Sequence, residues 1–466
     1  MTTIKPADPL LKTRILIFAL IAFNLVLKLL WLDVNELAHD EPFTVYWSQQ
    51  PLAAFWEMLR TENNPPLYFL LIKAWSAIVP FEASWLRVPS AVFSALAVWP
   101  LFLLARKLSG VRVALTASLL FTLTNYHFGF AHEVRAYSLL TLLATTGMWL
   151  LMRAKDKPNN GVRAMLGLSA LNVLLVYTHF FGWLAIGLQG LCVFLLPELR
   201  HLRRQFLFGL AITLAWFSPY LVIFMQRMGN SVAQGTWLEP PVPEELYNMI
   251  WRWSNAPVLA IGFLLLITVA CFRDRLRAGP LRLALIWCMV PLLGMFAVSF
   301  AVPMFLDRYL VYAAPGFALL VAVAIEQLRA PAYANAGIAA LAVVAMGFTF
   351  TPWKEGVYHP SRVVQQANAW CPDGCTMHVW PPWYNLNYAA ARGIERLKDD
   401  QRSFLDFNLE QAVVLTHDSV LPTIVVDASG EPSAARQPWY GSLRKVYPAA
   451  DSVEADHRVW VYRFRR

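Results

Sequence analysis

An adjacent pair of acids, Asp40 and Glu41, stands out in the string His39-Asp40-Glu41-Pro42 as a group that could do chemistry. A carboxylate can accept the proton of an attacking hydroxyl group, and a cation can stabilise a departing phosphate. Arginine suits phosphate well because its planar guanidinium presents a fork of donors. Later in the chain come His132, Glu133, Arg135, His179, Asp307 and Arg308. Together these residue types predict attack by a hydroxyl group on a phosphate-linked substrate.

Each of these groups also has a plain structural explanation. Asp40 and Glu41 would serve equally as exposed loop carboxylates, and Glu133 with Arg135 as a surface ion pair of small energy. Asp307 and Arg308 would serve to anchor a helix end, and the two histidines as polar residues at a membrane surface. The chemical hypothesis therefore depends on whether the chain brings these residues to one side of a membrane.

The composition identifies a polytopic membrane protein. The 466 residues are 58% hydrophobic and only 15% charged, with a mean hydropathy of +0.46, which lies outside the range of soluble domains. The net charge of +9 would suit a nucleic-acid partner. However, the basic residues form short clusters between apolar segments, where they fix orientation, so we expect membrane lipids and no nucleic acid as partners.

The first apolar segment, residues 14–32, is long enough to cross a bilayer and carries no cleavage site, so it predicts an uncleaved signal anchor. Lys12 and Arg14 precede it, which places the N-terminus in the cytoplasm and Asp40 outside. Lys28 near its outer end is expected to extend to the same surface. Residues 33–87 then form the first outer loop, with helices lying in the membrane interface.

Together with the first segment, the later apolar segments predict about eleven transmembrane helices. Taking 67–81 as a further span would reverse every later loop and put the arginine-rich ones outside. The predicted spans are 14–32, 88–105, 113–126, 138–152, 165–177, 181–196, 206–224, 257–272, 283–300, 310–325 and 333–350. With this topology the basic clusters fall inside and the candidate chemical residues fall outside, which predicts a transmembrane catalytic domain over residues 1–351.

Residues 352–466 have the composition of a soluble domain and are expected outside the membrane, because the number of spans is odd. Short β-like runs at 376–380, 423–426 and 459–464 and helical patterns at 362–369 and 389–398 predict a small α/β domain. Its role is either to cap the substrate or to stabilise the fold. Cys371 and Cys375 are disulfide candidates in such a compartment. A zinc site is not expected, since only His378 lies near these two cysteines.

Four motifs in order resemble those of the GT-C glycosyltransferases, in the branch of the protein O-mannosyltransferases and lipid A aminoarabinose transferases. They are His39-Asp40-Glu41-Pro42, Asn63-Asn64-Pro65-Pro66-Leu67-Tyr68, Arg87-Val88-Pro89-Ser90 and Glu133-Val134-Arg135-Ala136-Tyr137-Ser138, with Asp307-Arg308-Tyr309-Leu310 downstream. The resemblance covers about residues 14–153 well, and the order and spacing of the motifs are more specific than any one of them.

The resemblance implies a membrane enzyme that moves a sugar from a polyprenyl phosphate to a lipid, glycan or protein acceptor outside the cytoplasm. Asp40 matches the catalytic acid/base residue and Glu41 the second acid of that pair. Arg135 and Arg308 lie in motifs that would hold the donor phosphate, with Glu133, Tyr137, Tyr309 and Asp307 as substrate-binding neighbours. Many relatives carry His or Lys where this chain has Asn64, so His132 or His179 would supply that phosphate contact instead.

The predicted reaction is a single displacement that inverts the anomeric carbon and needs no cofactor, although it would be compatible with a divalent cation. An alternative is a transporter or flippase of a lipid-linked or anionic substrate, which would show charged or broken spans at the midplane. A membrane sensor would leave the Asp-Glu pair unexplained. Short loops and a signal anchor favour the bacterial inner membrane, with the C-terminal domain in the periplasm.

Overall fold

The chain forms two compact units, described by a computed structural model. The structure describes residues 9–60, 62, 64–156, 161–234, 238–274, 276–277, 279–372, 374–398, 421–431, 433–437 and 439–465. The helical unit comprises Met1–Leu30, Trp56–Tyr68 and Arg87–Pro352, and the sheet unit comprises Trp31–Phe55, Phe69–Leu86 and Trp353–Arg466. The sheet unit thus includes much of the predicted first outer loop, and the functional division after residue 351 stays a prediction.

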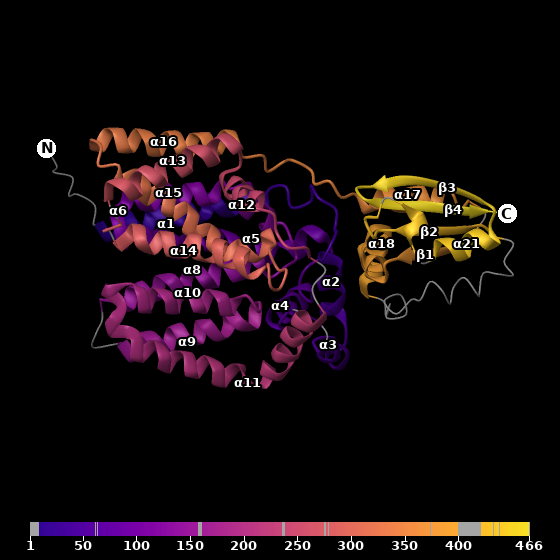
Figure 1. The fold of residues 1–466 in the computed structure, drawn as a ribbon, viewed down its shortest axis with the longest axis horizontal. Coiled ribbons are helices and arrows are strands. Elements are labelled where there is room, and N and C mark those ends of the chain that lie inside the picture. Colours follow the sequence, from indigo (N-terminus) through magenta and orange to yellow (C-terminus); the bar gives the residue numbers. More distant parts are fainter. Residues whose placement is uncertain are drawn as a thin grey trace. The chain divides into compact units, whose positions relative to one another are not determined.

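The described part of the helical unit is built mainly from α-helices (Figure 1), with short 3-10 helices between some of them. These are α1 (Pro9–Leu29), α6 (Val98–Thr122), α7 (Asn125–Ala131), α8 (Tyr137–Ala154), α9 (Gly161–Thr178), α10 (Gly182–Leu195), η2 (Pro197–Leu202), α11 (Arg203–Gln234), α12 (Glu244–Ser254), α13 (Pro257–Asp274), α14 (Gly279–Val298), η3 (Asp307–Ala313), α15 (Ala314–Gln327) and α16 (Ala332–Phe348). Three further helices, α3 (Leu52–Met58), α4 (Leu67–Ser76) and α5 (Ala83–Leu96), contribute residues to both units.

Helix α15 forms the centre of the helical unit. Every residue from Ala314 to Ile325 is buried, and the helix packs against α6, α13 and α14. A helix that is apolar on all sides is expected in such a position. Gly316 allows a close approach, since a Cβ atom there would lie 2.7 Å from Cγ of Trp287. The Trp287 indole donates a hydrogen bond of 2.9 Å to the Tyr312 carbonyl, which joins α14 to η3.

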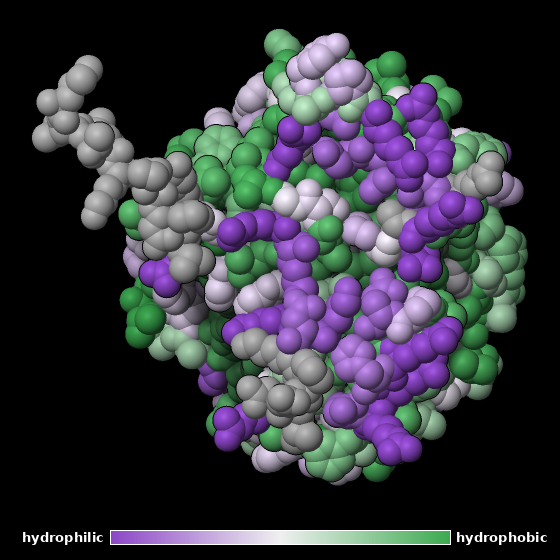
Figure 2. Space-filling view, turned by 90° about the vertical axis from the view of Figure 1, so that its left-hand side faces the viewer, coloured by the Kyte–Doolittle hydropathy of each residue, from purple (hydrophilic) through white to green (hydrophobic). Residues whose placement is uncertain are grey.

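Helix α6 breaks at Gly110, where the sequence predicted the turn between two spans. The φ angle of Gly110 is 88°, which glycine adopts without the strain that a Cβ atom would cause. On either side of the break, Lys107 pairs with Asp156 and Arg112 pairs with Glu326 at 3.4 Å. Hydrophilic side chains form a broad band across the corresponding end of the unit (Figure 2), as expected for helix ends that emerge at one membrane surface.

Five segments of the described chain are long and apolar enough to cross a membrane. They are Ala83–Thr122, Pro197–Asn230, Pro257–Asp274, Gly279–Val298 and Asp307–Gln327. Four shorter apolar helices also occur: Leu67–Ser76, Arg163–Thr178, Gly182–Leu195 and Ala332–Phe348. The mainly helical membrane fold is therefore confirmed, whereas the count of eleven spans, the orientation and the interfacial position of the loop helices stay predictions.

The sheet unit contains a four-stranded mixed sheet in the order β1-β2-β4-β3. Strands β1 (Thr376–Trp380) and β2 (Thr423–Asp427) are parallel, and β4 (Val459–Arg465) pairs antiparallel with β2 and with β3 (Ala449–Asp456). The helices of this unit are α2 (Glu41–Gln49), α17 (Pro360–Ala369), η4 (Pro382–Tyr384), α18 (Asn385–Arg392), η5 (Ile394–Lys398), η6 (Ala434–Arg436) and α21 (Tyr440–Val446). The predicted small α/β domain is thus present.

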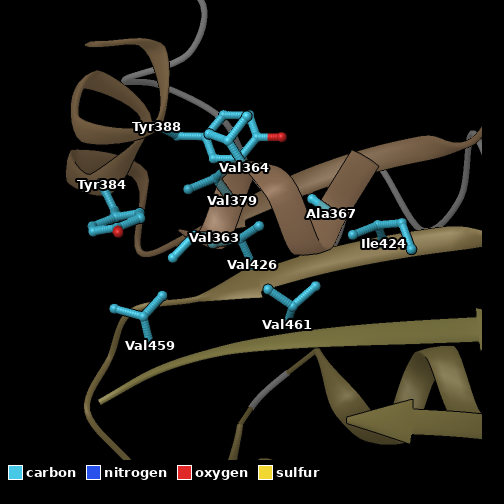
Figure 3. Packing of buried hydrophobic residues seen from close by; sticks show 10 residues of the cluster. All are labelled: Val363, Val364, Ala367, Val379, Tyr384, Tyr388, Ile424, Val426, Val459 and Val461. Carbon is cyan, nitrogen blue, oxygen red and sulfur yellow. The ribbon is translucent and has the colours of Figure 1, made fainter. Parts of the chain in front are cut away.

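Both faces of the sheet are covered, as the alternation in β2 requires. Ile424 and Val426 pack with residues of α17 and α18 in the core shown in Figure 3. Val425 points to the opposite face and packs with Trp439 and Leu443 of the α21 region. Successive side chains of a strand point to opposite faces, so the three consecutive apolar residues at the centre of β2 predict that both faces of this strand are buried.

Candidate active site

The acidic pair lies at the start of α2 in the sheet unit. Asp40 occupies the N-cap position and is half-buried, whereas Glu41 is the first residue of the helix and only 5% exposed. The Asp40 carbonyl accepts hydrogen bonds from the backbone nitrogen and the hydroxyl of Thr44, at 3.2 and 3.3 Å. A helix N-terminus favours a negatively charged side chain, so this position suits an ionised Asp40.

The residues before Asp40 are held by the C-terminal part of the same unit. Ser361 donates to Glu36 from its backbone nitrogen at 2.8 Å and from its hydroxyl at 2.5 Å. The Asn387 amide donates to the His39 carbonyl at 3.0 Å, and the ring of His39 meets that of Tyr358 edge-on at 3.7 Å. His39 has a left-handed backbone, with φ of 55°, which is unfavourable for a residue with a Cβ atom. These contacts therefore hold the backbone next to Asp40.

The far end of α2 is fixed by α4. The Lys73 ammonium donates to the carbonyls of Ser48 and Gln50, at 3.2 and 2.9 Å, where α2 ends and its last carbonyls lack helical partners. The Gln49 amide donates to the Ser76 hydroxyl at 2.9 Å. Helix α2 is thus held at both ends, so the acidic pair stands on a supported element.

In the helical unit, three of the sequence motifs meet through hydrogen bonds. The Tyr68 hydroxyl lies 2.6 Å from the Ser90 hydroxyl, and Ser90 donates to the Arg135 carbonyl at 3.3 Å. Tyr68 and Ser90 are buried, and Arg135 is 7% exposed in the turn that precedes α8. Motifs separated by dozens of residues therefore build one site around Arg135.

Two of the predicted phosphate-binding residues, Arg135 and Arg308, lie near a third, His179, which stands between α9 and α10. Burial, and then the charges of Arg135 and Arg308, lower the pKa of His179 to about 3. The His179 ring lies 6.0 Å from each of the rings of Tyr137 and Tyr309. Arg135 stands over Tyr137 and Arg308 over Tyr309, at 5.7 and 5.8 Å from the ring centroids. We name these five residues the cationic cluster.

His179 is neutral at physiological pH, and its hydrogen bond defines the tautomer. Its Nδ1 accepts a hydrogen bond of 3.1 Å from the backbone nitrogen of Phe181. The proton of the neutral ring is therefore on Nε2, which can donate to an anion. This arrangement suits a phosphate oxygen between two guanidinium groups.

His132 has a different arrangement from the one expected of a phosphate ligand. Its Nε2 donates to the Lys28 carbonyl at 2.9 Å. Burial, and then the charges of Lys28 and Arg87, lower its pKa to about 4 despite that hydrogen bond. The neutral ring consequently presents only the acceptor Nδ1 for further bonding, which disfavours a direct role in binding phosphate.

Lys28 does not extend to a surface, contrary to the sequence-based expectation. It is 0% exposed, and its ammonium lies 5.6 Å from the centroid of the Phe128 ring. Within the described part of the chain, no hydrogen-bond acceptor contacts its Nζ atom. A buried ammonium without an acceptor is costly, so this lysine destabilises the fold relative to an apolar side chain of similar size.

Glu133 and Asp307 line a cavity of about 380 Å³ in the helical unit, together with Tyr126, Phe130, Trp251 and Arg252. Asp307 forms an ion pair of 2.6 Å with Arg252 and accepts a hydrogen bond of 2.7 Å from the backbone nitrogen of Arg308. The amide of Asn64 donates to the Glu62 carboxylate at 2.7 Å. Asn64 is therefore already engaged within its own loop.

Several residues of this site escaped the sequence analysis. Trp251 and Arg252 belong to α12, whose amphipathic pattern marks a surface helix but does not single out these side chains. Lys28 looked like an ordinary residue at the end of a span. Only the packing of distant helices shows that these residues lie beside the motifs.

Among the described residues, no group of three or more His, Cys, Asp or Glu side chains is arranged to hold a metal ion. Cys371 and Cys375 form a disulfide in the sheet unit. His378 is buried, and burial lowers its pKa to about 4. The three other cysteines, Cys192, Cys271 and Cys288, are free thiols in helices.

Comparison with known families and proteins gives one family match. Residues 63–223 match the family of dolichyl-phosphate-mannose-protein mannosyltransferases. A comparison with curated proteins finds no match. The matched segment contains Tyr68, Ser90, Arg135 and His179, so it overlaps much of the cationic cluster and of the motifs bonded to it.

The fold is similar to that of two solved glycosyltransferases. The chain matches ArnT from Cupriavidus metallidurans in its apo state, with a TM-score of 0.64 and 15% identity over 97% of this chain and 98% of that one. The same protein bound to undecaprenyl phosphate gives 0.62 and 15%, over 96% and 97%. The archaeal oligosaccharyltransferase AglB from Archaeoglobus fulgidus, in complex with an inhibitory peptide and a dolichol-phosphate, gives 0.53 and 10%, over 89% and 70%.

Proposed function

The chain is a multi-pass membrane protein with the fold of the GT-C glycosyltransferases, and from this premise we propose that it transfers a sugar from a polyprenyl-phosphate donor. The acceptor is a hydroxyl group of a lipid, glycan or protein on the periplasmic side of the bacterial inner membrane. The sugar is a hexose or a pentose. Similar proteins have been solved with undecaprenyl phosphate and dolichol-phosphate, which supports a lipid-linked donor.

The observation that carries this proposal is the cationic cluster. A phosphate monoester or diester carries charge that fixed guanidinium groups and a neutral His donor can balance at little reorganisation cost. Arg135 and Arg308 supply the guanidinium groups, and His179 supplies the donor. In the reaction, these residues hold the donor phosphate and stabilise the charge that develops on it when the sugar leaves.

Asp40 acts as the base in this proposal. It accepts the hydroxyl proton of the acceptor while the acceptor oxygen attacks the anomeric carbon from the face opposite the phosphate, so the configuration inverts. The bond between the sugar and the phosphate oxygen breaks, and the lipid phosphate leaves with the bonding electrons. Glu41 is buried beside Asp40 and supports it as the second acid.

A transporter or flippase of a lipid-linked substrate would also need cations for phosphate. It would not need an acid held at a helix start by a network of hydrogen bonds to the neighbouring backbone. The supported position of Asp40 therefore favours the enzyme over the transporter.

Sugar transfer by purified protein tests the proposal. Radiolabelled polyprenyl-phosphate sugars are offered with a membrane extract as acceptor, and wild type is compared with Asp40→Asn and with Asp33→Asn, an exposed acid of the same loop. Loss of a general base is expected to reduce transfer about 10²–10⁴-fold in Asp40→Asn, and the control should retain activity. Binding of the donor lipids without transfer by the wild type would indicate the transporter.

A further inference from the structure

The cavity lined by Glu133 and Asp307 has walls that are already formed. Tyr126 and Phe130 meet edge-on at 5.0 Å, and the Tyr126 hydroxyl donates to the Asp307 carbonyl at 2.5 Å. The Asn255 side chain accepts from the backbone nitrogen of Asn125 at 2.8 Å and donates to the Leu123 carbonyl at 2.8 Å. These bonds tie the start of α7 to the end of α12, so the cavity has a fixed frame.

The charge of the lining is negative. Glu133 and Asp307 contribute two carboxylates, and Arg252 contributes one guanidinium, which pairs with Asp307. A phosphate would be repelled by this set, whereas hydroxyl and amino groups can donate to its carboxylate oxygens. The cavity is therefore electrostatically unlike the cationic cluster.

Aromatic side chains provide the rest of the lining. Tyr126, Phe130 and Trp251 contribute rings, and Trp251 is 41% exposed, which is high for a residue of this size. Aromatic rings beside polar groups provide an apolar surface next to hydrogen-bonding groups. This combination fits a molecule with CH faces and hydroxyl edges, which is the character of a sugar, and about 380 Å³ lies within the usual size of small-molecule sites.

The two sites are joined through the backbone. Glu133 lines the cavity, and Arg135, two residues later, belongs to the cationic cluster. Likewise, Asp307 lines the cavity, and the next residue, Arg308, belongs to the cluster. The Cα atoms of the consecutive residues Asp307 and Arg308 are about 3.8 Å apart, so this pair can contact neighbouring parts of one small molecule. In a glycosyl phosphate, the sugar ring and the phosphorus atom are separated by a single oxygen.

We propose that this cavity binds the sugar of the donor, and that the sugar is neutral or carries an amino group but no acidic group. The inference rests on the proposed function, because it takes the cationic cluster as the phosphate site. Glu133 and Asp307 accept hydrogen bonds from the sugar, and Trp251 covers one of its faces. The cavity thereby selects the sugar, while the cluster binds the phosphate common to all such donors.

Binding measurements on the full-length protein in detergent test this inference. The probes are undecaprenyl phosphate without a sugar and its derivatives that carry a neutral hexose, an amino sugar or a uronic acid. The variants are Trp251→Ala and Glu133→Gln, with Trp216→Ala as the control, because Trp216 is 69% exposed and lies on α11 away from the cavity lining. Melting temperatures confirm that each variant is folded.

We expect Trp251→Ala and Glu133→Gln each to weaken binding of the neutral glycosyl lipid by about tenfold, which corresponds to the loss of one stacking contact or one charge-assisted hydrogen bond. Binding of the sugar-free lipid should change less than about twofold. Wild type should bind the uronic acid derivative more weakly than the neutral one, and Glu133→Gln should reduce that difference.

Different failures have different meanings. If wild type binds the sugar-free lipid but both cavity variants weaken the two lipids equally, or weaken neither, the cavity is not the sugar site and the proposed function stands. Equal binding of the uronic acid and neutral derivatives by wild type would overturn the charge selectivity. If wild type binds none of the lipids, the proposed function itself is wrong.

Discussion

Asn387 is expected to control the activity of Asp40 without touching the substrate. Its amide donates to the His39 carbonyl at 3.0 Å, and its side chain is 2% exposed. The substitution Asn387→Ala removes this partly buried hydrogen bond, at a cost of about 0.5–1.5 kcal/mol. His39 is left-handed, with φ of 55°, a conformation that itself costs about 1–2 kcal/mol.

The hydrogen bond and the backbone strain at His39 are thus of similar size, so its loss lets the backbone relax and displaces Asp40. A shift of about 1.4 kcal/mol toward the relaxed form lowers the ratio of competent to relaxed forms about tenfold, so the competent fraction falls about fivefold if the two forms were equally populated. We therefore expect kcat to fall about fivefold in Asn387→Ala. KM for the donor lipid should change less than about twofold, because the proposed phosphate contacts come from Arg135 and Arg308.

Steady-state sugar transfer with varied donor concentration measures both constants. Asn368→Ala is the matched control, since Asn368 is an exposed asparagine of α17 in the same unit. His39→Gly removes the strain, because glycine adopts positive φ freely. The double variant, Asn387→Ala with His39→Gly, should therefore have a higher kcat than Asn387→Ala alone. An unchanged kcat in Asn387→Ala, or a loss that merely follows the amount of folded protein, would refute the reasoning.

Three further predictions concern stability and binding. Cys371→Ser with Cys375→Ser should lower the unfolding free energy by about 2 kcal/mol, the chain-entropy value for a loop of this length, and an unchanged melting temperature would contradict it. The pKa of His179 is about 3 in the folded protein and about 6.5 in the unfolded chain, so between these values only the unfolded chain binds the proton. The unfolding free energy should therefore fall as pH decreases from about 6.5 to 3. Denaturant titrations at several pH values should show a smaller fall in His179→Gln than in wild type. Lys28→Met should raise the unfolding free energy by about 1–4 kcal/mol, because methionine fills a similar volume without a buried polar group; a lower melting temperature in this variant would contradict it.

The sequence predicts those elements whose apolar pattern matches their burial. Strand β2 has an apolar centre, Ile424 to Val426, and is buried on both faces, and α15 is apolar on every side and lies at the centre of its unit. Strand β3, Ala449–Asp456, was missed because its residues have little preference for strands. It forms at the sheet edge since β4 supplies the hydrogen bonds. Whether such a segment forms a strand depends on pairing with its neighbour, which its own residues do not indicate.

The site shows the same limit. The motifs predict Arg135 and Arg308 as donor-phosphate residues, with His132 or His179 as a further contact, because arginine suits phosphate. They do not predict that Glu133 and Asp307 line a separate cavity with α12, nor that Lys28 is buried. These facts depend on how helices far apart in the sequence pack, since adjacent residues in a turn can face different neighbours.

The bond between Asn387 and His39 also orders events in time. The two residues are 348 positions apart in the chain. At synthesis rates of about 5–20 residues per second, the loop that carries Asp40 leaves the ribosome roughly 20 to 70 s before its support. During that interval the nascent chain has the acid but not the strained backbone that positions it. Under the proposed function, sugar transfer is therefore expected to begin only after Asn387 has been synthesised, so shorter nascent chains would not consume the lipid-linked sugar.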